Sequence, residues 1–200
     1  MANLKETILN PILKGNPITV LVLGICSSLA VTVQLKGACV MALSVIAVTG
    51  LSSLVVSLLR NTIPNRVRII VQLVVVAMMV ILVDQILKAF AYDVDKQLSV
   101  YIGLIITNCI VMGRIEAFAL GNKPIPSLLD GLANGFGYGM ILVIVAFFRE
   151  LLGSGTIFGL QVLPAGYVPN NLVILPLFAL ILLGCIIWVH RAFDKDLQEK

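Results

Sequence analysis

The stretch Leu104-Ile105-Ile106-Thr107-Asn108-Cys109-Ile110-Val111-Met112-Gly113-Arg114-Ile115-Glu116 is apolar enough to enter a membrane, yet it contains an amide, a thiol, a glycine and two charged side chains. A charged group at the centre of a bilayer costs about 3 kcal/mol unless protein groups partner it. Such a segment normally lies against other helices or lines a cavity, where an interrupted backbone can also be satisfied. We therefore expect a broken membrane segment that is covered by the rest of the protein.

The composition indicates that the whole chain is an integral membrane protein. Of its 200 residues, 60% are hydrophobic and 12% are charged, and the mean hydropathy is +1.07. A soluble domain has about half apolar residues and about a quarter charged ones. The net charge of +4 does not indicate a nucleic-acid-binding protein, because aromatic residues are few and the sequence has no basic run. The positive charges are better explained as Lys and Arg in short loops between membrane spans.

Six apolar segments follow a polar lead over residues 1–16, judged against the roughly 20 residues that a spanning helix needs. They cover 17–33, 38–59, 67–90, 98–119, 129–152 and 171–190. We predict an all-α protein with six transmembrane helices, in which 17–190 form one membrane domain and 191–200 a polar tail. No cleavable signal is evident. Ten Lys and Arg fall on the side of the termini against four on the other side, which predicts that both termini are cytoplasmic.

The two halves of this domain, about 17–90 and 98–190, resemble each other in pattern. The first and fourth segments each follow a polar stretch, are interrupted by small or polar residues, and contain a cysteine near the middle. Three spans per half make the halves enter the membrane from opposite faces, so we predict two inverted three-helix repeats with helices 1 and 4 interrupted. Matching interrupted segments in two halves indicate a site near the membrane midplane. In the fifth segment, Gly131, Gly135 and Gly139 predict close contact with another helix.

The cysteines of the interrupted segments, Cys26 and Cys109, are the candidate metal ligands. One interpretation is ligation of a metal or cluster at mid-membrane depth, and the other is packing, since a free cysteine behaves as a small hydrophobe. An iron–sulfur cluster usually needs four thiolates. The chain offers two at the right place, so either the site is of another kind or a similar subunit supplies two more. Cys39 and Cys185 have no polar neighbours in the sequence and are interpreted as packing residues.

Asp84 and Asp130 are candidates for cation handling, because acidic residues at membrane depth are costly and commonly functional. The alternative is that both are interfacial. Asp84 would then pair with Lys88 at i, i+4, and Asp130 would lie near a helix N-terminus, where negative charge is favoured. Four other charged residues are interpreted as structural or interfacial: Arg114, Glu116, Arg149 and Glu150.

Two motifs carry a family resemblance. Leu23-Gly24-Ile25-Cys26-Ser27-Ser28-Leu29-Ala30-Val31-Thr32 and Thr107-Asn108-Cys109-Ile110-Val111-Met112-Gly113-Arg114 resemble the cysteine motifs of the D subunits of sodium-translocating NADH:quinone reductases. The resemblance continues in order along nearly the whole chain. It includes residues 60–61, 63–65, 67–72, 83–89, 116–119, 125–127, 130–131 and 148–155.

The resemblance implies a six-helix subunit of the bacterial inner membrane with an inverted internal repeat. It would pair antiparallel with the homologous E subunit, and the pair would share a [2Fe-2S] cluster with two cysteines from each of the two proteins. Cys26 and Cys109 would be the ligands of this chain, and Asp130 would correspond to an acidic residue linked to sodium handling. The other partners would be the A, B, C and F subunits of the same complex.

The same resemblance implies where the electrons come from and where they go. NADH and FAD would belong to the F subunit, and flavins (FMN and riboflavin) to other subunits. The cluster would carry electrons across the membrane towards the C and B subunits and ubiquinone, coupled to sodium export. The chain has no nucleotide-binding or flavin-attachment motif of its own, so it would be active only within the complex.

Two alternatives remain at this point. The first is the E subunit of an Rnf complex, a homologous ion-translocating ferredoxin:NAD oxidoreductase. Ser27, where that family typically has proline, and a shorter loop after the fifth segment favour the quinone reductase. The second is a non-redox carrier with inverted repeats that uses Asp84 and Asp130. Loss of electron transfer on changing both Cys26 and Cys109 to serine would distinguish the redox subunit from the carrier.

Overall fold

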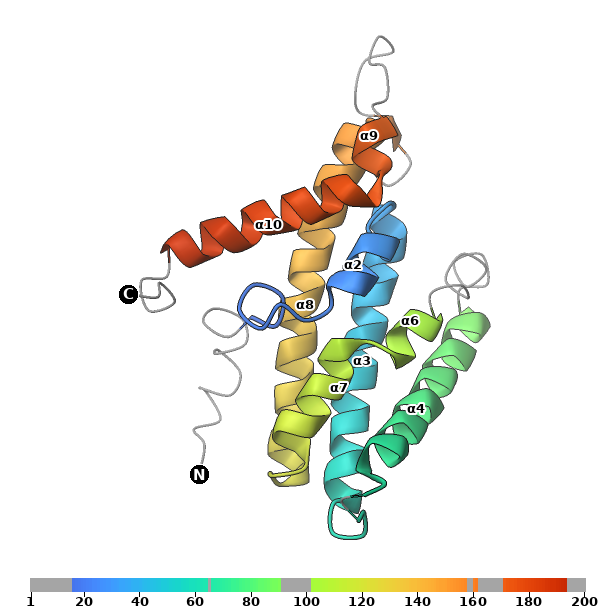
Figure 1. The fold of residues 1–200 in the computed structure, drawn as a ribbon. Coiled ribbons are helices and arrows are strands. Elements are labelled where there is room, and N and C mark those ends of the chain that lie inside the picture. Colours follow the sequence, from blue (N-terminus) through green and yellow to red (C-terminus); the bar gives the residue numbers. More distant parts are fainter. Residues whose placement is uncertain (1–15, 65, 91–101, 158–159, 162–170, 194–200) are drawn as a thin grey trace.

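The computed structural model describes residues 16–64, 66–90, 102–157, 160–161 and 171–193 (Figure 1). Within these ranges the regular structure is helical apart from one short antiparallel strand pair, formed by β1 (Thr156–Ile157) and β2 (Leu160–Gln161). The predicted all-α class is therefore confirmed for the membrane part. The leading and trailing residues, 1–15 and 194–200, lie outside the described ranges.

Among the described residues, three helices are long and apolar enough to cross a membrane: α3 (Leu35–Leu59), α4 (Arg68–Phe90) and α8 (Pro124–Gly153). They correspond to the second, third and fifth predicted segments. The predicted start of the fifth segment at residue 129 is wrong, because α8 already begins at Pro124. Prolines are tolerated in the first turn of a helix, where their missing N–H groups would have no intrahelical acceptor.

The glycines of the fifth segment pack α8 against α3, as predicted, and the two helices lie side by side (Figure 1). A Cβ on Gly135 would lie 2.8 Å from the Cα of Ile46, and one on Gly131 would lie 2.8 Å from the carbonyl oxygen of Thr49. Both neighbours are backbone atoms of α3, which cannot move aside cheaply. The close approach of the two backbones therefore requires glycine on the α8 face.

The fourth segment is broken, as its sequence indicates. It consists of α6 (Ile102–Ile106), a gap at Thr107 and Asn108, α7 (Cys109–Arg114) and a π-helical turn, η2 (Ile115–Ala119). The Asn108 side chain accepts a hydrogen bond from the Ile110 N–H and so caps α7. Asparagine is among the preferred residues at such a position, because its short side chain replaces a missing backbone acceptor.

The first segment is helical only over α2 (Ile25–Val31) instead of over 17–33. Residues 16–24 form turns, in which Val22 and Gly24 have left-handed backbone with φ of 55° and 83°. A β-branched residue in this region is strained, and such strain is tolerated only where the surroundings enforce it. The segment approaches the fourth one as an irregular chain that leads into a short helix.

The sixth segment consists of α9 (Asn171–Ile174) and α10 (Pro176–Phe193). The chain changes direction at Leu175 and Pro176, since proline offers no N–H to continue a helical ladder. In Figure 1, α10 extends away from the α3–α8 pair at a steep angle to α8. Six spans, the inverted repeat, the domain limits and cytoplasmic termini stay predictions.

Candidate metal centre at the two broken segments

Cys26 and Cys109, which the sequence places in separate halves, belong to one region of the fold. Cys26 is the second residue of α2 and Cys109 is the first residue of α7. The backbone N–H of Gly24 donates a hydrogen bond to Cys109 Sγ at 2.8 Å. The irregular chain before α2 therefore contacts the sulfur atom of the other segment directly.

A second contact joins the residues beside the two cysteines. Asn108 Nδ2 donates to Ser27 Oγ at 3.2 Å, and the Ser27 hydroxyl lies 2.7 Å from the Tyr138 hydroxyl of α8. Ser27 Oγ also donates to the Gly24 carbonyl at 3.1 Å. Ser27, Asn108 and Tyr138 are all buried, so these bonds form away from solvent. The two motifs thus meet through one group of polar contacts, which includes the Tyr138 hydroxyl of α8.

The two thiols could act as ligands of a centre that is completed from outside the chain. All four cysteines are free; Cys26 is exposed and Cys109 is partly buried. Among the residues that the structure describes, no group of three or more His, Cys, Asp or Glu could hold a metal ion. The N–H group on Cys109 Sγ suits a thiolate ligand, because hydrogen bonds to the sulfurs are among the features that tune iron–sulfur centres. The donor set fits half of a four-thiolate cluster.

The remaining two cysteines differ from each other. Cys39 packs against the hydrophobic core, as predicted. Cys185 was expected to pack as well, but it is exposed on α10. It lines an apolar groove with five other residues of α8 and α10, namely Phe148, Leu182, Ile186, Val189 and His190. The prediction is wrong because the steep angle of α10 leaves this face of the helix uncovered within the chain.

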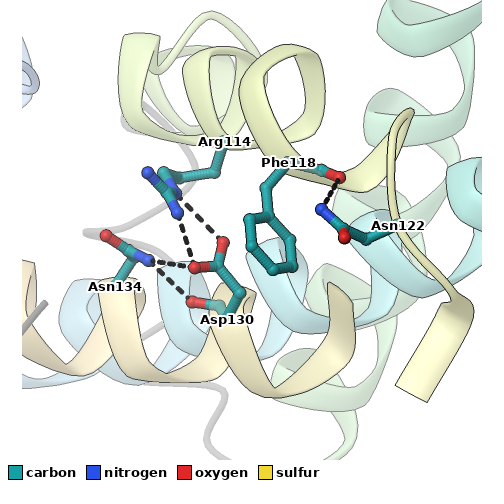
Figure 2. A network of polar contacts seen from close by, with 5 residues as sticks. All are labelled: Arg114, Phe118, Asn122, Asp130 and Asn134. Atoms are coloured by element: carbon teal, nitrogen blue, oxygen red, sulfur yellow. Dashed lines mark hydrogen bonds and ion pairs between the residues drawn. The ribbon is translucent and has the colours of Figure 1, made fainter. Parts of the chain in front are cut away.

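Asp130 lies in a buried ion pair (Figure 2). Arg114 donates to both of its carboxylate oxygens, with Nε–Oδ2 and Nη2–Oδ1 distances of 3.0 and 2.5 Å, and Asn134 donates to Oδ1 at 3.1 Å. The Arg114 guanidinium also lies 5.8 Å from the centre of the Phe118 ring, within the range of a cation–π contact. Asp130 is 3% exposed and lies in the second turn of α8, close to the helix N-terminus that one of the two interpretations assumed, and a role in cation handling stays a prediction. Arg114 is a structural charge, as predicted.

Asp84 forms the ion pair with Lys88 that its i, i+4 spacing predicts, with Nζ 2.5 Å from Oδ2. Glu116, in η2, pairs with Arg68 of α4 and accepts a hydrogen bond from Gln72 at 2.9 Å. Both carboxylates therefore already have cationic partners from the chain. Asp84 connects neighbouring turns of α4, and Glu116 connects η2 with α4. Neither carboxylate belongs to the contacts around Asp130.

Arg149 and Glu150, near the end of α8, bind the ends of other elements. The Arg149 guanidinium donates to Thr32 Oγ1 at 2.6 Å and to the carbonyls of Leu29, Val173 and Ile174. Glu150 Oε2 accepts from the Leu35 N–H at 2.5 Å, at the start of α3. A carboxylate at a helix N-terminus and a cation at helical carbonyls are both favourable. These two residues are structural, as predicted, but both are buried rather than interfacial.

Sequence reasoning missed the roles of Ser27, Asn108 and Tyr138. Asn108 directly before an apolar turn is an N-cap signal that could have located the start of α7. Tyr138, between Gly137 and Gly139, is a hydroxyl in the middle of an apolar span, and a buried tyrosine hydroxyl usually has a partner. Which partner it has depends on how α2 and α8 pack, and no pattern in the sequence gives that.

Comparison with known proteins assigns the chain to a family. A family model described as "Rnf-Nqr subunit, membrane protein" matches residues 4–187. The D subunit of the Na(+)-translocating NADH-quinone reductase of Aeromonas hydrophila subsp. hydrophila is 57% identical over 205 residues, covering 100% of this chain and 98% of the relative. The protein of the same name from Aeromonas salmonicida is 56% identical with the same coverage. The chain belongs to the Rnf-Nqr family of membrane subunits.

Proposed function

We propose that this chain is a membrane subunit of a sodium-translocating NADH:quinone reductase. It would carry electrons across the membrane through a [2Fe-2S] cluster shared with the homologous E subunit, coupled to sodium export. The relatives named as the D subunit of that enzyme support the complex to which it belongs. The observation that carries the redox role is the meeting of the two cysteine motifs through Gly24, Ser27, Asn108 and Cys109.

Cys26 and Cys109 would hold two of the four ligand positions, and the E subunit would supply the other two. When bound, the cluster supplies a one-electron redox couple inside a membrane that otherwise blocks electron transfer. The exposed Cys26 can reach a partner protein, whereas the partly buried Cys109 is fixed by the chain itself. NADH, FAD, FMN and riboflavin would bind to other subunits, which fits a chain that lacks their motifs.

Sodium handling by Asp130 would require Arg114 to move, because Arg114 binds both oxygens of its carboxylate. Asp84 is likewise paired with Lys88. These ion pairs count against a non-redox carrier that uses the two aspartates as free cation ligands. A subunit of an Rnf complex would use the same cysteines, and the choice between the two complexes rests on the named relatives.

The experiment is to measure NADH-driven quinone reduction and sodium uptake in inverted vesicles that contain the whole complex. Cys26→Ser and Cys109→Ser should each abolish both activities, while NADH oxidation by an artificial acceptor at the cytoplasmic subunit is retained. Cys39→Ser, which changes a packing cysteine, is the matched control and should retain all three activities. Quinone reduction at the wild-type rate in either ligand variant would contradict the proposal.

A further inference from the structure

The polar contacts around Ser27 include the residue whose backbone N–H faces the Cys109 sulfur. Gly24 has its carbonyl bonded to the Ser27 hydroxyl and its N–H bonded to Cys109 Sγ. The residue has left-handed backbone, with φ of 83°. A Cβ there would lie 2.6 Å from Ile110 Cδ1 and 2.9 Å from the Tyr138 ring. Only glycine brings its N–H to this sulfur without a clash.

The Ser27 hydroxyl has all of its hydrogen-bonding capacity in use. A hydroxyl has one proton to donate and two lone pairs that accept. Ser27 donates its proton to the Gly24 carbonyl, and one of its lone pairs accepts a hydrogen bond from Asn108 Nδ2. With that proton in use, the other lone pair of Ser27 accepts the hydrogen bond from the Tyr138 hydroxyl. The Asn108 amide is oriented without ambiguity, since its oxygen accepts from the Ile110 N–H. The donor directions therefore lead from Tyr138 to Ser27 to Gly24, whose own N–H lies on the sulfur.

We propose that Ser27 and Tyr138 are positioning residues that hold the Gly24 N–H on the Cys109 sulfur and so set the reduction potential of the centre bound there. This inference rests on the proposed function, because it assumes that Cys109 is a cluster ligand. A donor to a ligand sulfur stabilises the reduced state, which carries one more negative charge, and hydrogen bonds to the sulfurs are among the determinants of cluster potential. The partial burial of Cys109 strengthens the effect, because the local dielectric is lower than in water.

The test is an electron paramagnetic resonance redox titration of the membrane cluster in the intact purified complex. Ser27→Ala removes one of the two hydrogen bonds to the Gly24 carbonyl, the other coming from the Ser28 backbone N–H, and should shift the midpoint potential to a more negative value with the iron content unchanged. Tyr138→Phe keeps the ring that packs on Gly24 and removes only the hydroxyl, so it should shift the potential in the same direction by less. Should Ser27→Ala fail to assemble, Tyr138→Phe is the deciding variant.

Ser28→Ala is the matched control, because the hydroxyl of the buried Ser28 donates to the Ile25 carbonyl of its own helix, and the bond from the Ser28 backbone N–H to the Gly24 carbonyl is kept in the variant. It should leave the potential at the wild-type value. Wild-type potentials in both Ser27→Ala and Tyr138→Phe, with the iron retained, would overturn the inference. If, in contrast, replacing Cys26 and Cys109 leaves the iron unchanged, the proposed function itself fails, and the two failures are thereby distinguished.

Discussion

Asn108 Nδ2 lies 3.2 Å from Ser27 Oγ, so the residue before one candidate ligand is hydrogen-bonded to the residue after the other. The two residues are 81 positions apart in the sequence and both are buried. This contact joins the two interrupted segments at the level of their cysteines. The contact between the two segments therefore depends on short polar side chains beside the cysteines.

Asn108→Ala should destabilise the protein by about 2 kcal/mol, because it removes the cap of α7 and leaves the Ile110 N–H without its acceptor. The measurement is the thermal stability of the purified complex in detergent. Asn122→Ala is the control, since that side chain donates only to the Phe118 carbonyl in a less buried turn. An equal loss of stability in the two variants would show that the hydrogen bond between Asn108 and Ser27 adds nothing to the stability of the protein.

Gly24→Ala should be poorly tolerated. The added methyl group meets Ile110 and Tyr138 at less than van der Waals distance, and the left-handed backbone adds about 1–2 kcal/mol of strain. Overpacking of this kind costs about 1–3 kcal/mol more. Yield and thermal stability of the complex measure the effect. Gly37→Ala, on α3 with nothing within 4 Å of the new methyl group, should be neutral or slightly stabilising. Similar results for the two glycines would refute the geometry of the Gly24 turn.

Asp130→Asn should cost up to about 3 kcal/mol, because it leaves the charge of the partly buried Arg114 without its partner. Replacing both residues together, Arg114→Met with Asp130→Leu, should recover most of this loss, since no unpaired charge remains. Asp84→Asn, which breaks the pair with the exposed Lys88, should cost less than about 1 kcal/mol. A double variant that is no more stable than Asp130→Asn alone would contradict the ion-pair account.

Gly135→Val should prevent the close packing of α3 and α8, since its Cβ would meet the Ile46 backbone. We expect a loss of at least about 3 kcal/mol, and with it a loss of assembled protein in membranes, because the helix backbone must move. Quantitative immunoblotting of membranes measures this. Gly184→Val on α10, where a Cβ has nothing within 4 Å, is the matched control. Normal levels of the Gly135 variant would mean that the two helices do not approach as described.

The sequence predicted the long helices because each is a continuous apolar run, and the break at Asn108 because polar residues interrupt such a run. It also predicted, through glycines at every fourth position, that the fifth segment contacts another helix closely, but it did not identify α3 as the partner. Helix starts at prolines were less predictable: Pro124 follows a loop and Pro176 follows a break at Leu175, yet each is the first residue of a helix. Which buried groups pair could not be predicted either. The Arg114–Asp130 and Tyr138–Ser27 contacts depend on how helices that are distant in the sequence pack together.

The most direct test of the central claim is the iron and acid-labile sulfide content of the purified complex, with and without the substitutions Cys26→Ser and Cys109→Ser together. A shared [2Fe-2S] cluster predicts that the double variant loses about two irons and two sulfides per complex. The family resemblance implies a second iron–sulfur cluster in the cytoplasmic F subunit, and this cluster should remain visible by electron paramagnetic resonance. A Cys39→Ser, Cys185→Ser control should retain the full content. Equal iron in the double variant and the wild type would contradict the claim and return Cys26 and Cys109 to a packing role.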